Sequence, residues 1–341
     1  MPVFAAEALR LWLIAVFSTC GVAEDQAALT SGHLVRANLR GVDTHGMLRV
    51  PAYVKMLRAG ATNTSPRMTC EDRGGMLVVD ADGALGQVGG SFALRQAIAT
   101  GKTRGLVGVS IRNVGHLGAL GLFLEEAAVA GFAGMMMQNG PPIMGLPGSA
   151  RSAIGNNPLA FSAPVRGGPP LVFDMAASEV AFGRIMDHAR TGTPLQPGWA
   201  LDSAGRPTTD ATAALRGMLL PAGGYKGIGL AMLVETFAGS LTGLHAAASV
   251  APGQQLPSRF GAMLLLVNPE IVVGREIFDT HLGEWLAHYK GSSGEARYPG
   301  EKTAQMEGER AAAGIPLPDA VVTDLRRTGS EVGVPMPGPL V

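Results

Sequence analysis

Residues 105–158 alternate apolar runs with glycine turns, and this pattern constrains the fold of the chain more than any other stretch. Residues 106–111 are apolar and rich in β-branched side chains, which is typical of a buried strand. The glycine turn at 115–121 leads into a run of Ala, Leu and Glu that favours a helix. A second apolar run at 132–137 predicts a strand that ends in the turn-forming residues 138–142. This order of strand, helix and strand indicates an α/β or α+β architecture.

A single imidazole, His116, lies in the glycine turn between the expected strand and helix. Ligands of α/β sheets usually bind where a strand passes into a helix in this way. The spacing of the turn is G-x-x-G-x-x-G, however, whereas the dinucleotide fingerprint is G-x-G-x-x-G. That fingerprint also requires an acidic residue about 20 positions further on, but the next expected strand ends in Gln138 and Asn139. We therefore do not expect an ordinary Rossmann site. Close helix–strand packing for the glycines, and a buried structural position for His116, remain alternatives.

Charge and cysteine content narrow the possible classes of function. The 341 residues include 27 Lys and Arg against 27 Asp and Glu, so there is no basic field for nucleic acid. Cys20 and Cys70 make neither a disulfide framework nor a C-x-x-C site, which fits a reduced compartment. The apolar segment 5–19 predicts a buried helix rather than a signal peptide or membrane span, because it is short and no basic residue precedes Arg10. We expect a cytoplasmic protein without nucleic-acid or membrane partners.

A second polar cluster follows a helix predicted at 24–39, and it comprises Asp43, Thr44, His45, Arg49 and Tyr53. His45, Arg49 and Tyr53 stand four residues apart, so on one helix they would share a face. Pro51 disfavours an unbroken helix here and more often begins one. Asp43 and His45 have no further ligand nearby at a metal spacing, so we expect no metal site. The alternative role for Arg49 is structural, with the guanidinium paired to Asp43.

Two more polar residues stand at the ends of predicted elements. Asp174 follows a short apolar run at 171–173, where it could orient a polar ligand or cap a helix. Lys226 stands among glycines just before a helix predicted at 230–241. From there an ammonium group and main-chain N–H groups can bind a phosphate or carboxylate. Gly rather than Ser or Thr follows Lys226, so this is not a P-loop, and an exposed turn lysine is the alternative.

Five short motifs together point to one family. They are RGVDTHG at 40–46, GHLGA at 115–119, GNNP at 155–158, FDMA at 173–176 and KGIGL at 226–230. In order and spacing, over nearly the whole chain, they resemble the malate/L-lactate dehydrogenase family of NAD(P)-dependent oxidoreductases. That family includes ureidoglycolate, sulfolactate and diketogulonate oxidoreductases and cyclic-imine carboxylate reductases. Each motif is weak alone, and the set is specific.

The resemblance implies a homodimer whose cofactor fold is not Rossmann, in agreement with the missing ribose-binding acid. We accordingly expect an α+β (mixed α/β) fold with a non-Rossmann domain at 76–250 that binds NAD or NADP. A mainly helical dimerisation domain is expected from the two segments 1–75 and 251–341.

The resemblance also implies roles for individual residues. His116 is the expected proton donor or acceptor at the substrate oxygen, with His45 as the second catalytic candidate. The substrate side is expected to comprise Thr44, Arg49 and Tyr53. The cofactor side is expected to comprise Asn139, Asn157, Asp174, Met175, Ala176, Lys226, Gly300 and Glu301. The chain departs from the usual pattern at Thr44, where Ser is usual, and at Asn156, where Thr is usual. It also has Arg184 where many relatives have Lys and the imine reductases have Asp, which argues mildly against imine reduction.

The reaction implied is the interconversion of a small 2-hydroxy acid and its 2-keto acid. An alcohol that gives a hydride to a nicotinamide also loses a proton, which a histidine with a pKa of about 6.5 can accept at neutral pH. Arg49 can hold the substrate carboxylate through two parallel hydrogen bonds. A cyclic-imine carboxylate reductase and a non-catalytic nucleotide-binding homologue remain alternatives.

Overall fold

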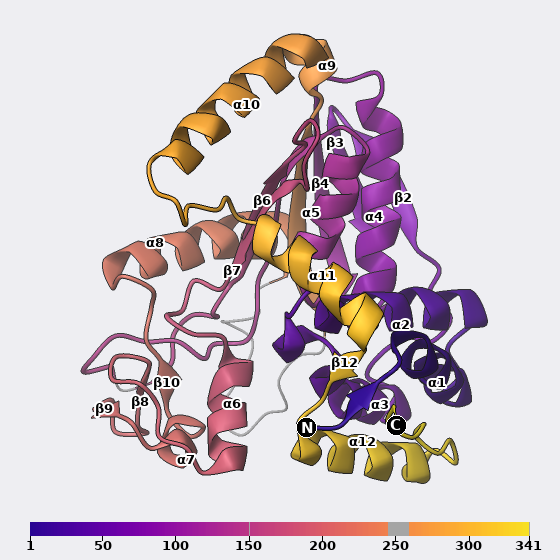
Figure 1. Ribbon diagram of the computed structural model, residues 1–341, viewed down its shortest axis with the longest axis vertical. Coiled ribbons are helices and arrows are strands. Elements are labelled where there is room, and N and C mark those ends of the chain that lie inside the picture. Colours follow the sequence, from indigo (N-terminus) through magenta and orange to yellow (C-terminus); the bar gives the residue numbers. More distant parts are fainter. Residues whose placement is uncertain (150, 245–258, 341) are drawn as a thin grey trace.

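A mixed seven-stranded sheet forms the centre of the molecule (Figure 1). The structure is a computed structural model that describes residues 1–149, 151–244 and 259–340. The strands of the sheet lie in the order β2-β3-β4-β11-β5-β6-β7. β3 and β4 pair in parallel, and the other neighbours in this sheet pair antiparallel. The strand bounds are β2 (Thr69–Arg73), β3 (Met76–Asp80), β4 (Leu106–Val114), β5 (Ala133–Gln138), β6 (Leu159–Ala163), β7 (Leu171–Met175) and β11 (Phe260–Val267).

The central strand β11 comes from a part of the chain far from its two neighbours in the sheet. It pairs with β4 on one side and with β5 on the other. Its sequence FGAMLLLV is buried along most of its length, as expected for a strand with neighbours on both edges. β11 and β2 fall outside the predicted cofactor domain at 76–250, so those predicted boundaries cut through the sheet. The division into domains stays a prediction, although long-range strand pairing adds β2 and β11 to the sheet of residues 76–250.

Two helices, α4 (Gly86–Gly101) and α5 (Leu120–Val129), cover one face of the sheet (Figure 1). Phe123 and Leu124 of α5 lie fully buried in the main core with the apolar residues of β4. The glycine run before α4 predicts a helix that begins near Ser91, but α4 begins at Gly86. Its glycines allow close packing on α5, since a Cβ on Gly90 would lie 2.7 Å from the Phe123 ring.

Segments from both ends of the chain form a mainly helical unit below the sheet (Figure 1). The antiparallel pair of β1 and β12 joins the two ends. Trp12 ties them further, because its Nε1 donates to Val334 O at 3.0 Å. The predicted helices at 5–19 and 24–39 are present. The elements of this unit are α1 (Ala6–Thr19), α2 (Glu24–Leu39), α3 (Val50–Arg58), α11 (Glu301–Ala313), α12 (Asp319–Glu331), β1 (Val3–Phe4) and β12 (Ile315–Pro316).

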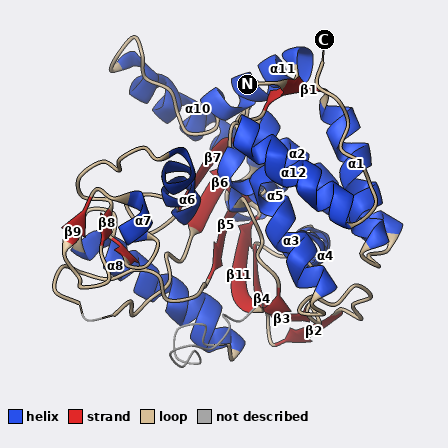
Figure 2. Cartoon of the chain, turned by 90° about the horizontal axis from the view of Figure 1, so that it is seen from below, coloured by secondary structure: helices blue, strands red, loops and turns tan. Residues whose placement is uncertain are grey.

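A smaller unit lies on the other side of the central strands (Figure 2). Its three short strands pair in the order β10-β8-β9. Lys226 lies in the first turn of α8, because that helix begins at Tyr225 and not at residue 230 as predicted.

Among the helices of the described residues, none has both the length and the apolar character needed to cross a membrane. The remaining elements are α6 (Phe182–Thr191), β8 (Ala200–Leu201), β9 (Pro207–Thr208), α7 (Ala211–Ala214), β10 (Met218–Leu219), α8 (Tyr225–Val234), η3 (Glu235–Gly239), η4 (Ser240–Thr242), α9 (Pro269–Val272) and α10 (Arg275–Gly291).

Candidate active site

His116 lies in the turn between β4 and α5, and the main chain of this turn is held on both sides of the histidine. Gln138, at the end of β5, donates from Nε2 to Gly115 O at 2.9 Å and accepts at Oε1 from Leu117 N at 2.9 Å. Gln138 is buried, so water does not compete for these bonds. Gly86 of α4 packs on the same turn, where a Cβ would lie 1.9 Å from His116 O. The imidazole is therefore presented from a rigid support.

The polar cluster after α2 reaches His116 from another part of the chain. Two short 3₁₀ turns, η1 (Asp43–His45) and η2 (Met47–Arg49), precede α3, so the cluster does not lie on the face of one helix. The His45 and His116 rings are nearly parallel, with an interplanar angle of 20° and centroids 5.7 Å apart. Tyr53 Oη lies 2.9 Å from His116 Nδ1. The fold therefore brings together residues that the sequence separates widely.

The Arg49 guanidinium completes this cluster, and it has no carboxylate partner in the described part of the chain. Its Nε donates to Thr44 O at 2.8 Å, and Thr44 Oγ1 lies 3.0 Å from His45 Nδ1. Asp43, the partner required by the structural alternative, instead accepts from Arg310 Nη1 at 2.7 Å. The proposed Arg49–Asp43 pair is thus wrong. Arg49 keeps a half-buried positive charge that a substrate carboxylate could neutralise.

The protonation states of the cluster follow from its enclosure. Burial lowers the pKa of His116 well below its ordinary value of 6.5, and Arg49 and His45 lower it further. Burial, with Arg49 second, lowers the pKa of His45 to about 3. Burial also raises the pKa of the Tyr53 hydroxyl. At neutral pH, both imidazoles and the phenol are therefore uncharged beside the Arg49 cation. A bound carboxylate would offset the Arg49 charge and raise both histidine pKa values.

A cavity of about 350 Å³ opens beside Thr44. One wall comes from α6, whose Arg184 is exposed and has no ion-pair partner among the residues that the structure describes. Gly183, at the start of α6, lies against the polar cluster. A Cβ on Gly183 would lie 3.2 Å from Thr44 Cβ and 3.5 Å from Arg49 Nη2. Thr44 thus borders both this cavity and the start of α6.

Asp174, at the end of β7, caps α5 rather than the helix that follows it in sequence. Its Oδ2 accepts from Gly121 N at 2.8 Å. Loss of water around the carboxyl raises its pKa to about 6, although the residue keeps exposed surface and the main-chain N–H groups of Gly121 and Leu120 act in the opposite direction. Met175 and Ala176 follow directly, so these three predicted cofactor residues lie near the helix that begins after His116.

Lys226 is exposed in the first turn of α8. The loop before α8 is tied to the segment after β7, because Ala222 N donates to Ala177 O at 2.9 Å. The first turn of a helix has main-chain N–H groups without helical partners, and the positive end of the helix dipole lies there. This combination with an ammonium group suits a phosphate oxygen.

Asn139 and Asn157 are buried, and their side chains are engaged within the protein. Asn139 Oδ1 accepts from Gly261 N at 3.0 Å, and its Nδ2 donates to Leu244 O at 3.0 Å. Asn157 Oδ1 accepts from Gly140 N at 3.0 Å, and its Nδ2 donates to Ala231 O at 2.9 Å. These contacts hold the loop after β5 against the segment that begins with α8. A direct role for either amide in cofactor binding stays a prediction.

Gly300 and Glu301 lie against the start of β7, whereas Asp174 lies at its end. Gly300 has a φ of +109°, and a Cβ there would lie 2.4 Å from Pro170 O. Glu301 accepts from Lys290 Nζ at 2.6 Å and from Tyr298 N at 2.9 Å. The two residues therefore anchor the beginning of α11.

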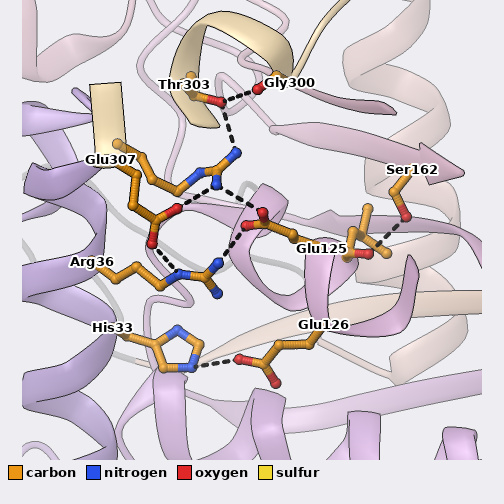
Figure 3. Close-up of polar contacts among 10 residues, drawn as sticks. His33, Arg36, Glu125, Glu126, Ser162, Gly300, Thr303 and Glu307 are labelled. Atoms are coloured by element: carbon orange, nitrogen blue, oxygen red, sulfur yellow. Dashed lines mark hydrogen bonds and ion pairs between the residues drawn. The ribbon is translucent and has the colours of Figure 1, made fainter. Parts of the chain in front are cut away.

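An ion network missed in the sequence occupies the junction of α2, α5 and α11 (Figure 3). Arg40, from the RGVDTHG motif, is buried and lies 2.7 Å from Glu125 Oε1 and 2.6 Å from Glu307 Oε2. Arg36 bonds the same two carboxylates at 2.9 Å each (Figure 3). Thr303 accepts from Arg40 Nη2 at 2.7 Å. The signal in the sequence was an acidic pair inside the otherwise apolar helix α5, and the network explains the motif arginine structurally.

Gln87 of α4 is a second residue that sequence reasoning missed. Its Nε2 donates to Tyr53 Oη at 3.1 Å and to Leu117 O at 3.1 Å. An amide in the first turn of a helix that begins with small and apolar residues was the available signal.

Comparison with known proteins identifies the family of the chain. The family model described as malate/L-lactate dehydrogenase matches residues 4–326. The chain is 33% identical over 310 residues to ureidoglycolate dehydrogenase (NAD(+)) of Escherichia coli, covering 88% of each chain. It is 34% identical over 319 residues to (2R)-3-sulfolactate dehydrogenase (NADP(+)) of Chromohalobacter salexigens, covering 92% of this chain and 94% of the relative. The structure of Δ1-piperideine-2-carboxylate reductase from Pseudomonas syringae matches with a TM-score of 0.86 at 30% identity, covering 96% of this chain and 100% of that one. The resemblance inferred from the five motifs is confirmed, and the chain belongs to the malate/L-lactate dehydrogenase family of NAD(P)-dependent dehydrogenases.

Proposed function

We propose that the protein interconverts a small 2-hydroxy acid and its 2-keto acid, with His116 as the acid/base group and Arg49 as the carboxylate-binding residue. The observation that carries the proposal is the meeting of two neutral imidazoles with a half-buried guanidinium that has no carboxylate partner in the described chain. A 2-hydroxy acid has its reacting oxygen and its carboxylate on adjacent carbons. Groups that bind them must therefore be close together, as Arg49 and His116 are.

In this proposal, His116 exchanges its proton through Nε2, because Tyr53 occupies Nδ1. The nicotinamide, when bound, takes or gives the hydride. Arg49 holds the carboxylate in one plane and thereby fixes the neighbouring carbon. His45, stacked on His116, offers a second polar group to the substrate oxygen. The rest of the substrate would extend past Thr44 toward the cavity that this residue lines.

We place a cofactor phosphate at Lys226, on the first turn of α8, since the donor groups there suit an anion. Equal affinity for reduced cofactor in Lys226→Ala and wild type would remove Lys226 from the site. The antiparallel neighbours in the sheet support a cofactor fold that is not Rossmann. We assign cofactor binding to residues 76–250 together with β2 and β11, and dimerisation to the mainly helical unit.

We also infer a homodimer that acts in the cytoplasm. The unpaired thiols of Cys20 and Cys70 fit a reducing compartment. Two helices, α8 and α10, project beside the sheet (Figure 1) and expose large apolar side chains. On α8 and the turns after it these are Tyr225, Met232, Leu233, Phe237 and Leu241, and on α10 they are Ile277, Trp285 and Tyr289. Patches of this kind mark protein interfaces.

The second candidate function is reduction of a cyclic-imine carboxylate, which the piperideine-carboxylate reductase neighbour favours. Initial rates with 2-keto acids and with cyclic-imine carboxylates, each with NADH and NADPH, separate the two. The proposal expects higher kcat/KM for a 2-keto acid than for any imine in the panel. Faster turnover of an imine would establish the second candidate, and cofactor binding without turnover of any compound would indicate a non-catalytic homologue.

A further inference from the structure

The Tyr53 hydroxyl lies at the meeting point of three elements, and it is shielded from water. Tyr53 comes from α3, Gln87 from α4 and His116 from the turn before α5. Tyr53 is 3% exposed and Gln87 is 1% exposed. Around Tyr53 Oη are His116 Nδ1 at 2.9 Å, Gln87 Nε2 at 3.1 Å and the main-chain His116 O at 3.3 Å.

The orientation of the Gln87 amide follows from its second partner. The same end of the amide lies 3.1 Å from Leu117 O, which can only accept a hydrogen bond. The nitrogen must therefore face Leu117 O, since two oxygens would repel each other. Because that nitrogen also faces Tyr53, Gln87 donates to the phenol oxygen. Gln87 Oε1 is buried without a partner among the described residues. Exchanging the amide oxygen and nitrogen would therefore add no hydrogen bond at that position.

The direction of the Tyr53 proton is then restricted to two acceptors. A phenol has one proton, and its oxygen already accepts from Gln87. The proton can point to His116 Nδ1 at 2.9 Å or to His116 O at 3.3 Å. The shorter contact is favoured, and donation from Gln87 strengthens the hydroxyl as a donor. A neutral His116 that accepts at Nδ1 must carry its own proton on Nε2.

We propose that Gln87 and Tyr53 form a tautomer switch for His116. In the unliganded protein, Tyr53 donates to Nδ1 and the neutral imidazole holds its proton on Nε2. When His116 becomes an imidazolium, Tyr53 turns its proton to His116 O and accepts from Nδ1–H. Gln87 is a positioning residue in both states, because it keeps the phenol oxygen in place. In its catalytic consequence, this inference rests on the proposed function of His116.

The proton count closes in each direction. In reduction, the imidazolium gives its Nε2 proton to the substrate oxygen as the hydride reaches the carbonyl carbon. The neutral imidazole left behind has its proton on Nδ1, with Tyr53 as acceptor. In oxidation, this same Nδ1–H form takes the hydroxyl proton on Nε2. The productive neutral form therefore differs from the resting one. The change passes through the imidazolium, which gains one proton from solvent on Nδ1 and loses the Nε2 proton to the substrate oxygen or to solvent. The second acceptor of Tyr53 lets the hydroxyl adapt to the proton on Nδ1.

The test is ¹⁵N NMR of the histidine side chains in the unliganded protein at neutral pH, with His116→Gln to identify the resonances of His116. The wild type is expected to show a protonated Nε2 and an unprotonated Nδ1. Gln87→Met removes the donor to Tyr53 and should shift His116 toward the Nδ1–H form. KM for the acid should change less than about twofold, because Gln87 does not touch the substrate in this proposal. Gln96→Met, in the same helix about 13 Å along its axis, is the matched control and should resemble the wild type.

A wild-type His116 protonated at Nδ1 would overturn the inference, and this measurement needs no variant. An unchanged tautomer in a folded Gln87→Met protein would overturn it as well. A different measurement would contradict the proposed function. A protein that turns over no 2-keto acid contradicts the proposed reaction, whereas the NMR result still decides the tautomer of His116.

Discussion

The charge of Arg49 sets the electrostatic character of the site. Its guanidinium lies among neutral side chains, and its polar contact in the described chain is to the Thr44 carbonyl. A charge held half-buried in this way costs free energy unless a ligand neutralises it. The protein therefore keeps Arg49 at some cost to stability, which a bound carboxylate would recover. The same charge lowers the pKa of both imidazoles.

Replacement of Arg49 by lysine tests this role. Lysine retains the charge but loses the planar pair of donors, so Arg49→Lys should lower kcat/KM for the acid by about 10- to 100-fold. Arg58→Lys, at the exposed end of α3, is the matched control and should be neutral. Steady-state kinetics and a fluorescence titration with reduced cofactor measure the two effects. If cofactor affinity and melting temperature fall together with kcat/KM, Arg49 is structural.

Neutral histidines make the stability of the fold depend on pH. Burial lowers the pKa of His33 to about 4 and that of His45 to about 3, and it also lowers that of His116. In the unfolded chain these groups titrate near 6.5. Below that pH the unfolded state binds more protons, so the free energy of unfolding falls as pH falls from about 6.5 toward 4. Asp174, with its raised pKa of about 6, opposes this trend, as do Glu125 and Glu126, whose pKa values burial raises.

His33→Gln removes one of these three titrating histidines, and His33 lies outside the proposed acid/base residues His116 and His45. The variant should show a slope of unfolding free energy against pH that is shallower by about 1 kcal/mol per pH unit between roughly pH 6 and 4.5. Urea denaturation at a series of pH values measures the slope. His281→Gln, whose side chain is 76% exposed, should follow the wild type. A His33→Gln slope equal to that of the wild type would show that His33 is protonated in the folded protein.

At the scale of the elements, close packing of α4 on the turn before α5 positions His116. Gly86 allows α4 to approach that turn until a Cβ would overlap His116 O at 1.9 Å. Gly86→Ala should therefore push the turn away and lower the free energy of unfolding by about 1–3 kcal/mol. The kcat of the variant should fall as well.

Gly32→Ala is the matched control for this change. Gly32 lies inside α2 with open space around it, so alanine there should stabilise the helix by up to about 1 kcal/mol. Urea denaturation of both variants at neutral pH makes the comparison. Equal effects of the two substitutions would contradict a positioning role for the Gly86 contact.

The whole molecule shows which features the sequence could predict. Local patterns predicted α1, α2, β4 and β5, because apolar periodicity and turn residues act within a few positions. The motifs predicted that residues near His45 and Tyr53 would meet His116. The sequence could not show that β11 lies between β4 and β5, since strand pairing at long range has no local signal. The start of α8 and the partner of Asp43 were missed for the same reason, because tertiary contacts decide them.

At the scale of the whole molecule, we predict that the protein assembles as a homodimer. The exposed apolar side chains of α8 and α10 should be covered by a second copy of the chain. Light scattering at micromolar concentration should give about twice the chain mass of 35.1 kDa. Trp285→Glu, at an exposed position of α10, should shift the equilibrium toward monomer. A wild-type mass of one chain would contradict the dimer.

The central claim is that His116 exchanges the proton with the substrate oxygen. The most direct measurement is kcat for reduction of the best 2-keto acid by wild type, His116→Gln and the exposed-site control His281→Gln. We predict that kcat of His116→Gln falls by about 100- to 10,000-fold with cofactor affinity unchanged, while His281→Gln matches the wild type. A folded His116→Gln protein with near-normal kcat would contradict the account and transfer the role to His45.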